Sequence, residues 1–188
     1  MIGHHAIHGH ALVSADDRIA DADGAMPPML FDPVDWRRFQ AALSASVAVV
    51  LGRLGHETHP NTRERNRVVV SAGARGLERR ADAWWWNPAD VTVEEALAAA
   101  APEPGVVAVP GGCRVFDLFL TVGYDRFDLA RAAQITLPGG VPVFSAVAAD
   151  GIGAEAILAR HGLAVASREV LDADASVSLA SWRRAARA

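Results

Sequence analysis

Short runs of apolar, often β-branched residues recur along this chain with helix-like segments between them, and this alternation limits the fold more than any other feature. Such a run is typical of a strand that is buried on both faces of a sheet. Four runs are predicted to be strands: Val47–Leu51, Val68–Val70, Ala83–Trp86 and Val106–Val109. Strands that alternate with helices predict an α/β domain with a mainly parallel central sheet and helices on both faces.

The helices have recognisable starting residues. Asp32-Pro33 combines a favoured N-cap with a proline that fits the first helical turn, and Trp36, Phe39 and Leu43 follow at helical spacing. Thr92 starts a second helix, which continues to Ala101. Two further helices are predicted, through Val115–Leu120 and over about Ala154–His161.

The remaining elements lie toward the ends of the chain. An early strand is predicted at Ala11–Val13, and an Asp-, Gly- and Pro-rich loop of the length typical of functional loops follows at Asp16–Pro28. Three later strands are predicted at Gln134–Leu137, Leu163–Leu171 and Ser176–Leu179, and the last two form an antiparallel C-terminal pair. The stretch Thr121–Ala133 receives no role. The 188 residues are predicted to form one domain, 1–188.

The composition excludes several kinds of chemistry. All 18 basic residues are arginines, which excludes Schiff-base catalysis, pyridoxal-phosphate chemistry and a lysine-bearing phosphate loop. Cys113 is the only cysteine, so disulfide bonds, thiolate zinc sites and iron–sulfur clusters are excluded. Tyr124 is the only tyrosine and no lysine follows it, so a Tyr-Lys reductase dyad is excluded as well.

The charge and hydropathy patterns limit the partners. The net charge of −4 argues against a nucleic-acid partner. No apolar run of about 18 residues and no signal peptide is found, so we expect a soluble cytoplasmic protein without a membrane partner, as a monomer or homodimer. The N-terminal histidines His4, His5, His8 and His10 either bind a metal or belong to a solvated terminus. Because no acidic residue completes a ligand set, no metal site is predicted.

Glycine, arginine and serine residues follow three of the predicted strands. Ligands of parallel sheets bind at the carboxyl ends of the strands, so these residues are candidates for a binding site. They are Gly52-Arg53, Ser71 with Arg75, and Gly111-Gly112 with Arg114. A pair of glycines before a helix lets backbone N–H groups approach a phosphate, and the arginines add charge-assisted hydrogen bonds. The alternative is that Gly111-Gly112 is only a tight strand-to-helix turn.

Asp35 is the carboxylate of greatest interest. It shares a helical face with Phe39, one turn later. An acid on a largely apolar face has either a raised pKa, which suits it to catalysis, or a partner that neutralises it. The alternative is structural, because an acid at the third helical position beside the N-cap Asp32 complements the helix dipole.

Six segments, in order, resemble dihydrofolate reductase and its relatives, including the reductase domain of riboflavin biosynthesis. They are Leu12–Asp16 with Ile19, Ala25–Pro27, Asp35–Phe39, Val49–Arg53, Arg65–Ser71 and Val109–Leu120. The resemblance covers about residues 9 to 137 and implies a dihydrofolate reductase-like fold with NADPH as the cofactor. It also implies that Asp16–Pro28 is a mobile loop that closes over the nicotinamide.

The resemblance also implies roles for individual residues. Asp35 falls on the catalytic carboxylate that holds the pterin ring, and Leu12, Phe39, Arg65 and Pro110 fall on substrate-binding positions, with Arg65 pairing with the glutamate tail of folate. The implied cofactor-binding residues are Ala11, Ile19, Gly52, Arg53, Ser71, Arg75, Gly111, Gly112, Arg114 and Val115. The first hypothesis is an NADPH-dependent reductase of dihydrofolate. The alternatives are a reductase of a ribosylaminopyrimidine or other pterin-like compound, and a non-catalytic NADPH-binding protein.

Overall fold

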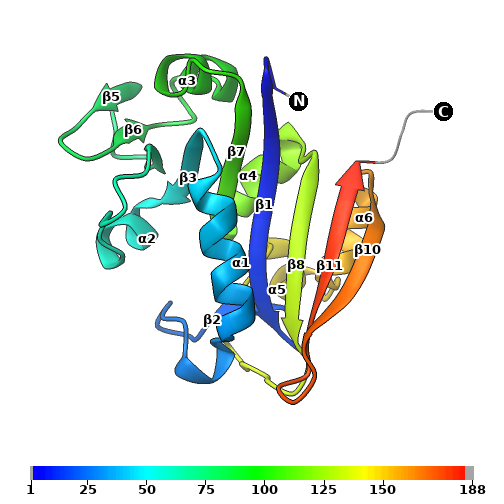
Figure 1. The fold of residues 1–188 in the computed structure, drawn as a ribbon. Coiled ribbons are helices and arrows are strands. Elements are labelled where there is room, and N and C mark those ends of the chain that lie inside the picture. Colours follow the sequence, from blue (N-terminus) through cyan, green and yellow to red (C-terminus); the bar gives the residue numbers. More distant parts are fainter. Residues whose placement is uncertain (1, 185–188) are drawn as a thin grey trace.

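The computed structural model describes residues 2–184, and a nine-stranded sheet forms its centre (Figure 1). The strands of this sheet are β1 (His5–Ser14), β3 (Ala48–Gly52), β4 (Arg67–Val70), β5 (Leu77–Arg79), β6 (Trp84–Trp86), β7 (Gly105–Gly111), β8 (Arg126–Ala132), β10 (Leu163–Asp172) and β11 (Val177–Arg184). Their order in the sheet is β10-β11-β8-β1-β7-β3-β4-β6-β5. A second, two-stranded sheet pairs β2 (Arg18–Ala20) with β9 (Val141–Pro142).

Most of the strand pairs in the large sheet are parallel. β1 pairs in parallel with β7 and β8, and β3 pairs in parallel with β7 and β4. Only the edges are antiparallel, where β11 joins β8 and β10 on one side and β5 joins β6 on the other. The predicted parallel sheet with an antiparallel C-terminal pair is confirmed.

Helices cover both faces of the sheet (Figure 1). The helices are α1 (Pro33–Ser44), α2 (Arg53–Thr58), α3 (Val93–Ala100), α4 (Cys113–Val122), α5 (Ser145–Ala149) and α6 (Ala154–Arg160), with a 3-10 turn at Pro28–Leu30. Helix α1 lies on the front face in Figure 1, and α4, α5 and α6 lie behind the sheet. Within the described residues, no helix is both long enough and apolar enough to cross a bilayer.

Two helices start at the capping residues that the sequence predicts. The side chain of Asp32 accepts hydrogen bonds from the backbone N–H groups of Val34 and Asp35, and Pro33 occupies the first turn of α1. Thr92 and Glu95 form a reciprocal capping box at the start of α3. These caps fix where α1 and α3 begin and therefore which faces the two helices turn toward the sheet.

The core is unequal on the two faces of the sheet. The larger cluster packs α3, α4 and α6 against the strands and contains Phe116, Phe127 and Trp86. The smaller cluster lies under α1, from which Leu43 is the one fully buried residue. Trp85 belongs to the smaller cluster and Trp86 to the larger one, so neighbouring rings of β6 face opposite sides, as the period of a strand requires.

Two sequence predictions in this part of the fold are wrong. The strand predicted at Gln134–Leu137 is a turn and loop. A strand that was not predicted, β8, lies inside the stretch Thr121–Ala133 that had received no role, and it pairs with β1. Charged residues alternate with apolar ones along β8, a pattern that indicates a strand with one apolar face and that a search for continuous apolar runs does not find. The N-terminal histidines form a solvated terminus only at His4, which is exposed. β1 begins at His5, whose ring is buried and hydrogen-bonds the carbonyl oxygen of Ala101 at 2.8 Å.

Candidate active site

Most of the predicted substrate site is brought together in one pocket, here called the acid pocket. It has a volume of about 150 Å³ and lies between α1, β1 and the end of β7. Its lining residues are His10, Ala11, Leu12, Ile19, Met26, Asp35, Trp36, Phe39, Pro110 and Phe116. Six of these were predicted from the sequence as substrate or cofactor residues: Ala11, Leu12, Ile19, Asp35, Phe39 and Pro110.

The acid pocket is lined by two ionisable side chains, the carboxyl group of Asp35 and the imidazole of His10. Burial raises the pKa of Asp35 to about 6, and the negative charges of Asp32 and Asp128 add to the rise, while Arg38 opposes it. Within the described residues, no side chain donates a hydrogen bond to its carboxylate. An acid that is partly protonated near neutral pH can both accept a hydrogen bond from a heterocyclic ring and supply a proton to it.

Phe39 and Trp36 give the acid pocket a flat aromatic side. Their ring centroids lie 5.6 Å apart, and Phe31 continues the series at 5.9 Å from Trp36. The side chains of Phe31 and Trp36 are 50% and 40% exposed, and those of Met26 and Met29 are exposed as well. An apolar rim of this kind around one buried acid favours a planar ring with a hydrogen-bonding edge.

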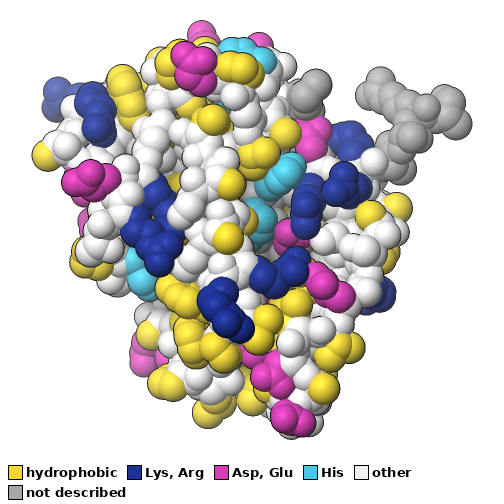
Figure 2. All heavy atoms as spheres, in the orientation of Figure 1, with side chains coloured by type: hydrophobic (Ala, Val, Ile, Leu, Met, Phe, Trp, Pro, Cys, Tyr) yellow, Lys and Arg dark blue, Asp and Glu magenta, His cyan; other side chains and the backbone are white. Residues whose placement is uncertain are grey.

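A second and larger hollow, here called the polar cavity, lies between α1 and the sheet. It has a volume of about 410 Å³ and shares His10, Ala11, Asp35 and Phe39 with the acid pocket. The other lining residues are His8, Arg38, Ala41, Ala42, Ala45, Ser46, Val106, Arg126, Asp128 and Leu179. Figure 2 shows histidine side chains beside α1 with arginines and acids around them on this face.

The predicted cofactor residues meet at one edge of the sheet. β7, β3 and β4 are parallel neighbours, so their carboxyl ends lie side by side. The residues at these ends are Gly52, Arg53, Ser71, Arg75, Gly111, Gly112, Arg114 and Val115. Pro110, which precedes the Gly111-Gly112 turn, lines the acid pocket, so that turn adjoins the site of Asp35.

The Gly111-Gly112 turn leaves backbone groups available for an anion. Both glycines have left-handed φ angles, 136° and 89°, which other residues rarely adopt. Gly112 starts α4 without a side-chain cap, so side chains do not satisfy the first N–H groups of that helix. Across the turn, a Cβ added to Gly52 would lie 3.5 Å from the Cγ2 of Val115, so bulk at Gly52 would narrow this edge.

Three predicted residues have contacts that differ from their expected roles. Arg65 does not line the acid pocket; its guanidinium donates hydrogen bonds to the carbonyl and side-chain oxygens of Gln40 and to Ser44 on α1. Arg53 forms an exposed ion pair with Glu57 at 2.7 Å. The Oγ of Ser71 accepts a hydrogen bond from the N–H of Gly73, and the Arg75 and Arg114 side chains are exposed at this edge.

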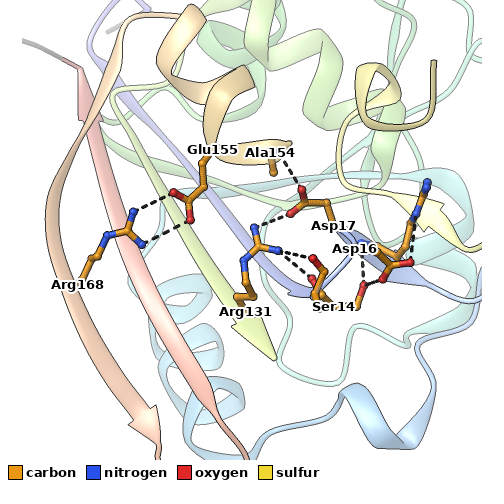
Figure 3. Close-up of polar contacts among 9 residues, drawn as sticks. Ser14, Asp16, Asp17, Arg131, Ala154, Glu155 and Arg168 are labelled. Atoms are coloured by element: carbon orange, nitrogen blue, oxygen red, sulfur yellow. Dashed lines mark hydrogen bonds and ion pairs between the residues drawn. The ribbon is translucent and has the colours of Figure 1, made fainter. Parts of the chain in front are cut away.

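The loop after β1 is held firmly over its first part (Figure 3). Asp17 accepts hydrogen bonds from Arg131 of β8 at 2.6 Å and from the N–H of Ala154 at the start of α6 at 2.9 Å. Asp16 accepts from the hydroxyl of Ser14 and from the N–H of Leu137. After β2, the described side-chain hydrogen bonds of the loop Asp16–Pro28 are local ones, from the N–H groups of Asp23 and Ala25 to Asp21.

His10 and Asp128 line the site but were not among the predicted site residues. His10 lines both hollows, and its Nδ1 lies 3.6 Å from a carboxylate oxygen of Asp128 on β8. Burial lowers the pKa of His10 to about 4, although Asp128 opposes this. The available signal was the alternation of His8, His10 and Leu12 with apolar residues, which places all three on one face of a strand.

Comparison with known proteins identifies the fold. No protein-family model matches the sequence, and no curated protein matches it. A solved dihydrofolate reductase from Enterococcus faecalis, complexed with NADP(H) and RAB-propyl, has a TM-score of 0.65 and 17% identity, over 95% of this chain and 96% of that one. A putative riboflavin biosynthesis protein from Shewanella sp. PV-4 has a TM-score of 0.64 and 19% identity, over 96% of this chain and 99% of that one.

A third solved structure is bifunctional by its description. It is a diaminohydroxyphosphoribosylaminopyrimidine deaminase/5-amino-6-(5-phosphoribosylamino)uracil reductase from Thermotoga maritima, with a TM-score of 0.65 and 17% identity. The match covers 96% of this chain and 56% of that one, so this chain spans about half the length of that protein. Together these likenesses show that the chain has the dihydrofolate reductase-like fold that its sequence segments implied.

Proposed function

We propose that this protein is an NADPH-dependent reductase that reduces a planar pterin or pyrimidine ring, with dihydrofolate as the first substrate to test. The observation that carries the proposal is the position of Asp35. Its carboxyl group is the acid of an otherwise largely apolar pocket, and that pocket adjoins the Gly111-Gly112 turn at the carboxyl edge of the sheet. A ring held against Asp35 would therefore lie next to the edge where a nicotinamide nucleotide is expected to bind.

The residues at this edge fit a dinucleotide phosphate. The uncapped N-terminus of α4 offers backbone N–H groups, and the exposed Arg75 and Arg114 offer guanidinium groups that suit phosphate oxygens. Arg53 joins them when its exposed ion pair with Glu57 opens, and such surface pairs contribute little stability. Bound NADPH would supply the hydride; the protein's own part is to align the ring and to exclude water from it.

Asp35 has two tasks in this proposal. As a carboxylate it accepts hydrogen bonds from ring nitrogen atoms and orients the ring against Phe39. Because its pKa is about 6, it also holds a proton in a minority of molecules at neutral pH and can favour protonation of the ring.

A reductase of a ribosylaminopyrimidine is the second candidate, and the contacts of Arg65 favour it. Arg65 was expected to bind the glutamate tail of folate, but its guanidinium donates to Gln40 and Ser44 on α1 instead. A substrate without a glutamate tail does not need Arg65 as a binding partner, so Arg65 can keep its hydrogen bonds to α1. The two candidates therefore differ in whether Arg65 leaves these partners when the substrate binds.

The experiment is a substrate screen followed by absorbance of NADPH, with dihydrofolate and a ribosylaminopyrimidine phosphate as the two test compounds. We expect oxidation of NADPH with one of them, and a loss of at least about a hundredfold in rate for Asp35→Asn, the lower end of what a positioned acid contributes. Asp150→Asn, at an exposed position after α5, serves as the matched control. A rise in Tm with NADPH but no oxidation with either compound would identify a non-catalytic binding protein instead.

A further inference from the structure

The sheet face beneath α1 carries a grid of polar side chains, which is unusual for a sheet that a helix covers. The register of β1, β8 and β11 places His8, Arg126 and Arg183 in one row and His10, Asp128 and Ser181 in the next. The opposite face of the same strands carries apolar residues such as Ile7, Phe127 and Trp182 of the larger core cluster. One face of these strands is thus built as a core and the other as a polar surface.

Helix α1 does not fill the space above this grid. The residues that it turns toward the polar cavity include Ala41, Ala42 and Ala45, whose side chains are too short to reach the sheet. A hollow of about 410 Å³, open to solvent, is therefore left between the helix and the sheet. Its size lies in the range of small-molecule sites.

The polar groups of the cavity are already fixed in place. The Oδ1 of Asp128 accepts hydrogen bonds from Nε of Arg126 at 2.8 Å and from the hydroxyl of Ser181 at 2.7 Å, and its Oδ2 faces His10. Arg38 is held at the rim by Glu169 of β10 at 2.9 Å. Groups that are held before a ligand arrives lose little conformational entropy when it binds.

The balance of charge in the cavity favours a neutral ligand. Arg38 and Arg126 would repel a cation, and Asp35 and Asp128 would repel an anion. Burial lowers the pKa of His8 and of His10, so both imidazoles are neutral at pH 7, and each then offers one donor and one acceptor. The sheet wall therefore carries donors and acceptors, and the wall on the side of α1 carries alanine methyl groups flanked by the charged side chains of Asp35 and Arg38. A molecule with hydroxyl groups on one side and C–H groups on the other matches the part of the cavity between the sheet and these alanines.

We propose that the polar cavity is a binding site for a neutral polyhydroxy group, a sugar or a polyol, with its hydroxyls toward His8, His10 and Asp128 and its C–H face against the alanines of α1. The cavity shares His10, Ala11, Asp35 and Phe39 with the acid pocket. The polyhydroxy group is either a separate ligand or a substituent of the substrate whose ring Asp35 holds. The second possibility rests on the proposed function.

The test uses ribitol as the probe, with saturation-transfer NMR to detect binding and calorimetry to measure it. Ala42→Leu fills the cavity from α1, and we expect it to weaken ribitol at least about tenfold. Ala99→Leu makes the same change at an exposed position of α3 and is expected to bind ribitol like the parent chain. Asp128→Asn keeps the shape of the side chain, removes an acceptor and serves as the second variant if Ala42→Leu does not fold.

The result of the ribitol experiment can be distinguished from the result of the test for reductase activity. Undetectable ribitol binding, or binding that neither Ala42→Leu nor Asp128→Asn weakens, overturns the proposed site, whether or not the protein oxidises NADPH. Ribitol binding that depends on these residues supports the site even if no reductase activity is found. Competition between ribitol and the reductase substrate identifies the arm of that substrate as the natural occupant, and simultaneous binding identifies a separate ligand.

Discussion

At the scale of single residues, the partial burial of Asp35 in the acid pocket gives stability a pH dependence. Burial raises the pKa of Asp35 from its ordinary 3.8 to about 6. The folded chain then binds this proton more tightly than the unfolded chain, so the contribution of Asp35 to the free energy of unfolding falls as pH rises from about 4 to about 6 and is level above that. His10, whose pKa burial lowers from 6.5 to about 4, contributes in the opposite direction over that range, so the contribution of Asp35 is isolated by comparing variants. This difference in the pKa of Asp35 between the folded and the unfolded chain changes the free energy of unfolding by at most about 3 kcal/mol.

Asp35→Asn should remove that part of the pH dependence. The variant should gain stability over the parent chain as pH rises toward 7, by roughly 1–3 kcal/mol, because an amide pays no cost for losing a proton inside the pocket. Urea unfolding of both proteins from about pH 4 to about pH 7 measures this difference. A difference that stays constant across the range would show that the Asp35 carboxyl is not destabilised by burial.

Sequence reasoning found Asp35 but not its neighbour His10, and the reason is local. Asp35 is recognisable because it follows an N-cap and a proline on a helix with an apolar face. His10 was grouped with histidines of an N-terminus that was expected to be solvated, whereas β1 extends back to His5 and buries it. Only the pairing of β1 with β7 and β8, which depends on residues about a hundred positions away, reveals this burial.

At the scale of elements, Arg65 acts as a link between α1 and the segment before β4. Its guanidinium donates to two oxygens of Gln40 and to the hydroxyl of Ser44, near the C-terminal end of α1. Arg65→Leu should therefore lower the free energy of unfolding by about 1–2 kcal/mol, because these acceptors lose a charged donor. Arg63→Leu, at an exposed position two residues earlier, is the control for urea unfolding. Equal effects of the two changes would contradict the link.

The link through Asp17 is stronger, because it joins three elements. The Asp17 carboxylate is buried, binds Arg131 of β8 and caps the N–H of Ala154 in α6, and its backbone has a left-handed φ of 60°. Asp17→Ala should cost about 3–4 kcal/mol, since it removes the carboxylate partner of Arg131, removes the cap on Ala154 and places alanine in a strained conformation. Asp17→Asn keeps the bond to Ala154 and tolerates this φ, so thermal unfolding should show a smaller loss. An equal loss for both variants would assign the effect to charge alone.

Strands that are buried on both faces were easier to predict from the sequence than strands with one polar face. β3, β4 and β7 are buried on both faces and stand out as apolar runs, and the alternation of strands with helices predicted that the sheet is mainly parallel. β8 was missed because Arg126 and Asp128 face the polar cavity while Phe127 and Leu129 face the core. Such alternation indicates a strand but does not distinguish a polar cavity wall from a solvated face, so the polar cavity could not be predicted from it.

At the scale of the whole molecule, the two faces of the sheet differ in how tightly their helices are held. α4 buries Val115, Phe116, Phe119 and Leu120, whereas α1 buries only Leu43 and stands over a hollow. Local opening of a helix costs less when fewer apolar contacts must be broken. The molecule is therefore a firm layer of α4, α6 and sheet with a loosely packed helix on the side of the candidate site.

Hydrogen exchange measured by NMR at neutral pH should reveal this difference. Amides in the middle of α1, such as those of Phe39 to Leu43, should exchange at least about tenfold faster than those of Phe116 to Leu120 in α4, because α1 opens without global unfolding. Ala42→Leu should slow exchange in α1 and leave α4 unchanged, since a leucine there fills the hollow and adds apolar contacts with the sheet. The exposed control Ala99→Leu should slow neither helix. Equal protection of α1 and α4 in the parent chain would mean that α1 opens only when the whole molecule unfolds, so that the hollow beneath it does not weaken its attachment.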